Sequence, residues 1–124
     1  MRLKASTLLF AAACLSVACA KQTEEDLIAR GTLLDKTYRG SVESAAPCLG
    51  ERLAARGWTP VTDAGPVQAE IRVTTKALGI DDELQIFRME PAEDDGSFRT
   101  RVYGDWIVSL TTMIDVLESC SDER

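Results

Sequence analysis

Apolar and polar residues alternate with a period of two along three segments in the second half of the chain. These are residues 70–76, 83–89 and 97–103, and short turns rich in Asp and Gly separate them. A period of two is typical of strands with one covered face, and short links join antiparallel strands. We therefore predict a three-stranded antiparallel meander.

The pattern changes to a helical period on both sides of these strands. Before them, Ala45, Leu49 and Leu53 share one helical face, and Gly57 stands where such a helix would end. Ser41 or Ser44 can cap the start, and Pro47 fits only if the helix begins near Ser44, because a proline deeper inside removes a hydrogen bond. We predict a helix from about residue 44 to residue 57.

A second helical stripe ends the chain, with Asp105 as its expected cap. It consists of Trp106, Leu110, Met113, Ile114, Leu117 and Cys120. Together with the first helix and the meander, it predicts an α+β fold: a two-layer sandwich with the order helix-β-β-β-helix and both helices on one face of the sheet.

The segments outside this pattern are less regular. Thr23 precedes Glu24-Glu25-Asp26 and predicts the N-cap of a short helix. Residues 33–39 fit either a strand or an extended arm. Residues 59–67 contain two prolines and a glycine and predict a loop.

The first 20 residues resemble a bacterial export signal. A short basic start is followed by an uncharged run from Ala5 to Ala18, too short to span a bilayer. Ala18-Cys19-Ala20 fits cleavage before Lys21, which would release a soluble periplasmic protein. Leu15 to Cys19 also resembles a lipobox, with Cys19 as the lipidated residue of an outer-membrane lipoprotein facing the periplasm. Both alternatives place the protein in the cell envelope.

This interpretation divides the chain into a signal sequence at residues 1–20, an arm or tether at 21–40 and one α+β domain at 41–124. The full chain has a net charge of −6, and residues 1–20 hold Arg2 and Lys4 but no acid, so their removal leaves −8. Such a charge disfavours nucleic acid and anionic lipid as partners. A lipid anchor at Cys19 is the one membrane contact that we expect.

Of the four cysteines, Cys14 and Cys19 fall within the export signal, and Cys48 and Cys120 remain in the mature domain. In an oxidising compartment such a pair predicts a disulfide, here between the two helices. The alternative is a reactive Cys48 thiol. It lacks a histidine base, because the chain contains no histidine.

No catalytic, cofactor or metal motif is apparent in the sequence. The acidic turns Asp81-Asp82-Glu83 and Glu93-Asp94-Asp95 lack the spacing of a calcium loop, and we expect solvated hairpin tips. No serine lies in a nucleophile motif. We therefore expect no cofactor and do not expect an enzyme.

The sheet face away from the predicted helices is the candidate binding surface. The alternation places arginine and aromatic side chains there, which are enriched at interface anchors. These candidate residues are Arg72, Phe87, Arg99, Arg101 and Tyr103; Met89, Glu70 and Gln85 are assigned to the same face. The alternative is an ordinary solvated surface with cross-strand pairs.

Three features together are similar to small uncharacterised envelope proteins of bacteria. They are the cysteine in the first helix of the domain, the strand start Gly96-Ser97-Phe98-Arg99 and the terminal helix ending in Cys120. The resemblance covers about residues 41–120 and implies a fold and a compartment. We expect a protein-binding module of accessory, inhibitor or immunity type. The alternatives are a periplasmic small-ligand binder with a pocket between helices and sheet, and a hydrolase.

Overall fold

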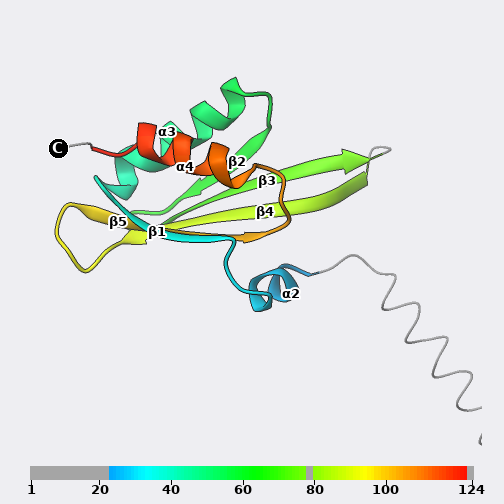
Figure 1. Cartoon of the computed structure of the whole chain (residues 1–124), viewed down its shortest axis with the longest axis horizontal. Coiled ribbons are helices and arrows are strands. Elements are labelled where there is room, and N and C mark those ends of the chain that lie inside the picture. The colour runs from blue at the N-terminus through cyan, green and yellow to red at the C-terminus, as the bar shows by residue number, and fades with distance from the viewer. Residues whose placement is uncertain (1–22, 78–79, 123–124) are drawn as a thin grey trace, which may run out of the picture.

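Five antiparallel strands form one sheet in the computed structural model, which describes residues 23–77 and 80–122 (Figure 1). Their order across the sheet is β1-β5-β4-β3-β2. The strands are β1 (Leu34–Arg39), β2 (Pro60–Ala64), β3 (Ala69–Ala77), β4 (Ile80–Pro91) and β5 (Ser97–Gly104). The helices of the described residues are α2 (Glu24–Ala29), α3 (Val42–Ala55) and α4 (Leu110–Ser119).

The helices lie on both faces of the sheet. Figure 1 shows α3 and α4 together over one face and α2 on the other side. The predicted α+β class and the two helices on one face are therefore confirmed. The prediction of a two-layer arrangement omitted α2, which adds a small third layer.

The predicted meander is present as β3, β4 and β5, but the prediction of three strands is wrong. The predicted loop at 59–67 contains β2, which pairs with β3. Residues 34–39, within the predicted arm, form β1 and pair with β5. For residues 33–39 the strand alternative is therefore confirmed over the extended arm. The burial of β2 does not alternate, so the local sequence pattern did not indicate that strand.

The main core lies between the sheet and the helices α3 and α4. Strand positions facing these helices alternate with positions on the other face, as the register requires. The largest fully buried side chains of this core are Leu49, Leu53, Ile71, Val73, Phe87, Met89, Phe98, Val102, Met113 and Leu117.

Three β4 residues lie on the opposite face from the one predicted. Phe87 is fully buried and stands opposite Ile71 and Val102 in the register, so it faces α3 and α4. Met89 and Gln85 lie on the same side. Because Leu84 and Ile86 are apolar too, β4 is apolar on both faces, and its alternation alone does not distinguish inside from outside.

The start of α3 lies at Ser41, one of the two predicted caps, rather than near Ser44, and its end agrees with the prediction. Ser41 is the N-cap, so Pro47 lies inside the helix. Pro47 is exposed, and the Glu43 carbonyl that loses its donor lies in the solvent-facing first turn. At the other end, Gly57 has a φ of 101°, and the Trp58 N–H donates to the Leu53 carbonyl at 3.2 Å. This is a Schellman termination.

Helix α4 begins later than predicted. Ser109 is its N-cap, and Asp105 is not. The Asp105 carboxylate instead accepts from the Leu84 N–H at 3.1 Å and pairs with Arg30 at 3.3 Å. Trp106 therefore lies outside the helix and is 55% exposed, although the predicted stripe included it.

The predicted disulfide is confirmed. Cys48 in α3 bonds to Cys120, the C-cap of α4, across 72 residues of sequence. It joins the middle of α3 to the C-terminal end of α4. The export signal predicted at residues 1–20, with Cys14 and Cys19, lies outside the described residues. No helix in the described part of the chain is both long enough and apolar enough to cross a membrane.

Candidate functional site

The face of the sheet opposite α3 and α4, here called the open face, carries four of the five predicted binding residues. Arg72, Arg99, Arg101 and Tyr103 all lie on it, as the alternation predicted. Phe87 does not, because it belongs to the main core. Arg88 of β4 lies on the open face, opposite Arg101 in the register; the face reversal in β4 hid it from the prediction.

Helix α2 covers part of the open face. Thr23 caps it through a capping box with Asp26, which confirms the predicted cap. Leu27 is buried, and so are Ile86 and Tyr103 of the open face, although none of the three belongs to the main core. Since α2 contacts β5, we attribute this burial to α2. The chain thus covers one end of its own candidate surface.

Four charged side chains connect α2 to the sheet. The Glu24 carboxylate pairs with Arg72 and, at 3.3 Å, with Arg88. Glu70 pairs with the same two arginines, at 2.7 Å and 3.1 Å. The pKa of Arg72 is raised, chiefly because its guanidinium donates a hydrogen bond to Glu24. The cluster is neutral in sum, with two carboxylates and two guanidiniums.

The remaining predicted arginines also have partners within the chain. Arg99 donates to both carboxylate oxygens of Asp35, at 2.7 Å and 2.5 Å, and this lowers the pKa of Asp35. Arg101 pairs with Glu90. These pairs agree with the cross-strand pairing that the sequence offered as the alternative to a binding surface. These residues form cross-strand ion pairs, so charge reversal would also break contacts within the domain.

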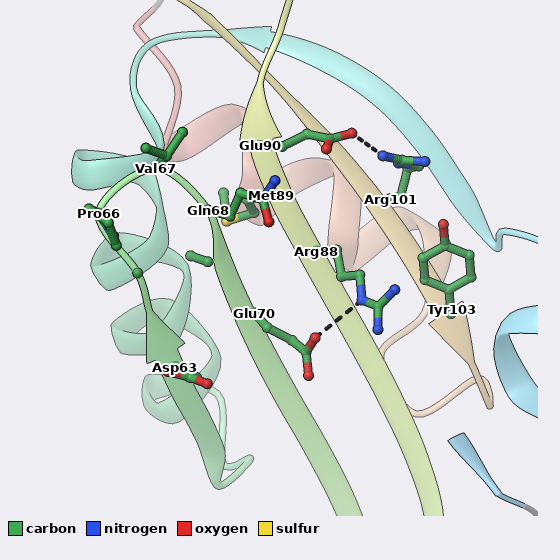
Figure 2. A pocket seen from close by; sticks show the side chains of 12 residues that line it. Asp63, Pro66, Val67, Gln68, Glu70, Arg88, Met89, Glu90, Arg101 and Tyr103 are labelled. Atoms are coloured by element: carbon green, nitrogen blue, oxygen red, sulfur yellow. Dashed lines mark hydrogen bonds and ion pairs between the residues drawn. The ribbon is translucent and has the colours of Figure 1, made fainter. Parts of the chain in front are cut away.

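A groove of about 680 Å³ runs across the open face beside the β2–β3 turn. Figure 2 shows the Glu70–Arg88 pair on its floor, Tyr103 and the Glu90–Arg101 pair on one side, and the turn on the other. The turn side is formed by Asp63, Pro66 and Val67. Arg88 also lies over the Tyr103 ring, 5.7 Å from its centroid. The groove thus has a polar floor, formed by Glu70 and Arg88, and an apolar margin, formed by Pro66 and Val67.

Two large apolar side chains are exposed on β2 and on the β2–β3 turn. Val61 of β2 is 64% exposed and Val67 of the turn is 56% exposed. The side chain of Asp63, between them in the sequence, has no hydrogen bond or ion pair within the described chain. The sequence analysis missed all three because it took residues 59–67 for a loop. Val61 and Val67 on either side of Asp63 form no sequence pattern that would predict a binding strand.

The arrangement offers recognition rather than evident chemistry. Cys48 is bonded to Cys120, so it does not supply the thiol nucleophile considered from the sequence. Within residues 23–77 and 80–122, no three His, Cys, Asp or Glu side chains are grouped so that they could hold a metal ion. The groove instead combines paired charges, one unpaired carboxylate and exposed apolar side chains.

Comparison with protein-family models, with curated proteins and with solved structures finds no match to this chain.

Proposed function

We propose that this chain is an exported cell-envelope protein that binds another protein through the open face of its sheet. The observation that carries the proposal is the groove on that face with Val67 exposed at its margin, together with the exposed Val61 on the same face of β2. Arginine and tyrosine, which line the groove, are residue types enriched at protein interfaces. The protein acts as an accessory, inhibitor or immunity factor and performs no catalysis.

The disulfide supports the envelope location. Disulfides persist in oxidising compartments and are rare in the cytosol, where thiols are kept reduced. The Cys48–Cys120 bond therefore agrees with an export signal at residues 1–20. The mature chain begins either at an acylated Cys19, in an outer-membrane lipoprotein, or at Lys21, in a periplasmic protein. Mass spectrometry of the intact protein from an envelope fraction distinguishes them, and an uncleaved cytosolic chain contradicts export.

The binding proposal is tested by capture from an envelope extract. We expect the domain to retain a specific protein and the Val67→Asp variant to lose it, because the charge enters the apolar margin of the groove. Leu110→Asp is the matched control: Leu110 is 42% exposed on α4, on the other face of the sheet, and this variant should retain the protein. Capture that both variants retain, or no capture at all, contradicts the proposal.

The volume of the groove also supports a small-molecule alternative, since ligand pockets of about 300–1,000 Å³ are common. Such a ligand would occupy the open face and not the space between helices and sheet, which the main core fills. Thermal stabilisation of the purified domain by a compound library, lost in the Val67→Asp variant, would favour this alternative over a protein partner.

A further inference from the structure

We propose that the free edge of β2 binds an extended, positively charged segment of the partner protein as an added β-strand. This inference rests on the proposed protein-binding function and specifies its mode and its partner chemistry. Strand addition uses the backbone hydrogen-bonding groups of an exposed sheet edge for affinity and the neighbouring side chains for specificity.

The two edges of the sheet differ in how they are protected. At the β1 edge, the Asp122 N–H donates to the Arg39 carbonyl at 2.8 Å, so the C-terminal segment occupies part of that edge. Lys36 of β1 also pairs with Glu118 of α4 at 3.9 Å. Charged edge strands and covering segments are the usual protection against further pairing. The β1 edge is therefore closed to a partner.

No segment of the described chain covers the β2 edge. Thr62, Asp63 and Ala64 are exposed, and in the described chain no hydrogen bond beyond the β2–β3 pairing reaches their backbone. The Gly65 N–H donates to the Gln68 carbonyl at 2.8 Å. Because hydrogen-bonded and non-hydrogen-bonded pairs alternate in antiparallel sheets, Asp63 bonds to β3, and Thr62 and Ala64 direct their N–H and C=O groups outward.

Pro60 agrees with this alternation, because its missing N–H falls on the outward side, where β3 needs no donor. Pro60 contributes an outward carbonyl, and Thr62 and Ala64 each contribute a donor and an acceptor. A segment of about five residues can pair with these groups, which is the common length of a strand.

The charge of the added strand follows from the row of side chains next to it. In the register, Asp63 stands opposite Glu70, Glu70 opposite Arg88, and Arg88 opposite Arg101. Glu70 is neutralised by Arg72 and Arg88, but Asp63 faces a like charge and has no partner of its own in the described chain. Like charges opposite each other destabilise a sheet, whereas a Lys or Arg on the added strand beside Asp63 would compensate its charge.

The same charge argues against a second copy of this chain as the occupant. The protein carries 20 acidic and 14 basic residues, so two copies repel each other, and a β2–β2 pair would place two uncompensated Asp63 side chains in one sheet. A basic segment would instead be attracted by the net negative charge of the protein and by the Asp63 carboxylate. Its apolar residues on the open face would lie beside Val61, which is exposed on that face.

The test selects nine-residue peptides from a displayed random library for binding to the purified domain. We expect the selected peptides to alternate as a strand does, with a Lys or Arg two positions from a β-branched residue on the same face, and to contain little proline. Thr62→Pro should weaken their affinity about tenfold or more, because it removes one hydrogen bond and places a ring on the edge. The Thr62 N–H does not bond to β3, so this variant should keep its fold.

Thr37→Pro is the matched control. Thr37 lies on the β1 edge. Gly40, three residues after Thr37, donates its N–H to the Gly96 carbonyl of the neighbouring strand. Because bonded and non-bonded pairs alternate, the Thr37 N–H points outward. Peptide affinity should be unchanged in this variant. Asp63→Lys should exclude the basic peptides, and Asp63→Asn should weaken them less. Circular dichroism of each variant confirms that the fold is retained.

The outcomes separate this inference from the proposed function. Peptides that bind Thr62→Pro as well as the native domain, or that are acidic or without alternation, overturn the strand addition, as does an empty selection. If envelope capture still succeeds and depends on Val67, the protein-binding function stands without this mode. A dimer of the isolated domain in sedimentation, abolished by Thr62→Pro, would identify a second copy as the occupant and also overturn the inference.

Discussion

The side-chain amide of Gln85 forms two hydrogen bonds with the backbone of Val108. Its Nε2 donates to the Val108 carbonyl at 3.3 Å, and its Oε1 accepts from the Val108 N–H at 2.9 Å. Both residues are fully buried. Val108 lies in the link between β5 and α4, which has no strand or helix to pair its backbone. Gln85 therefore allows that link to cross the core.

Replacing Gln85 with methionine should lower the free energy of unfolding by about 2–4 kcal/mol. The side chain keeps its approximate volume, but the N–H and C=O of Val108 lose their partners, and each buried unsatisfied group costs about 1–3 kcal/mol. Urea unfolding followed by circular dichroism measures the change. A loss below about 1 kcal/mol would show that water replaces the amide.

Thr100 provides the matched comparison on the neighbouring strand. Its hydroxyl is buried and has no hydrogen-bond partner among the described residues. Thr100→Val removes an unsatisfied polar atom at nearly constant shape, so the free energy of unfolding should stay within about 1 kcal/mol of the native value or rise. A marked destabilisation in the same urea experiment would reveal a hidden partner of this hydroxyl.

Loss of the disulfide should destabilise the domain by about 4 kcal/mol, since the bond closes a loop across 72 residues of sequence. The double variant Cys48→Ala, Cys120→Ala tests this by thermal and urea unfolding. In a domain of this size, the expected loss is a large part of the total stability. If the variant unfolds at the native midpoint, the two helices are held together by packing alone.

Alkaline conditions should destabilise the domain through Tyr38. Burial raises the pKa of Tyr38 to about 12, with a smaller contribution from the negative charge of Glu118. Because this pKa exceeds that of the unfolded chain, near 10, the proton is held more tightly in the folded state, and stability falls as the pH rises from about 10 to 12. Tyr38→Phe should flatten this decline.

Tyrosinate absorbance measures the same group directly. Tyr38→Phe should remove the ionisation near pH 12. If the native domain and Tyr38→Phe lose stability equally above pH 10, the decline originates elsewhere. Short exposure times are needed, because strong base also attacks disulfides.

Helix α2 should detach without unfolding the rest of the domain. It has six residues, and Leu27 is its one buried side chain within the described chain. Leu27→Ala removes about 2–3 kcal/mol of local burial, and a helix this short has little stability of its own. Hydrogen exchange should accelerate in residues 24–29 while the core strands stay protected. Uniform acceleration would instead show that α2 belongs to the main cooperative unit.

Sequence patterns were informative where the structure depends on near neighbours in the chain. The alternation in β3 and β5, the capping box at Thr23 and the Schellman end at Gly57 are local, and each was predicted. The pairing of Cys48 with Cys120 followed because, once the export signal is set aside, these two are the cysteines left to pair. The open-face position of Arg72, Arg99, Arg101 and Tyr103 followed from strand alternation alone.

Other features were decided by tertiary contacts. In β4, Phe87 and Ile86 are both apolar, and the register opposite Ile71 and Val102 determines which of them faces α3 and α4. The strands β1 and β2 form because a sheet edge accepts them, although neither shows a regular pattern of burial.

The ion pairs of the open face join residues far apart in the chain, from Glu24 to Arg88, so their partners are set by the fold. A local pattern determines the conformation of a segment. Which of its faces is buried, and which edge remains free, depends on what packs against it.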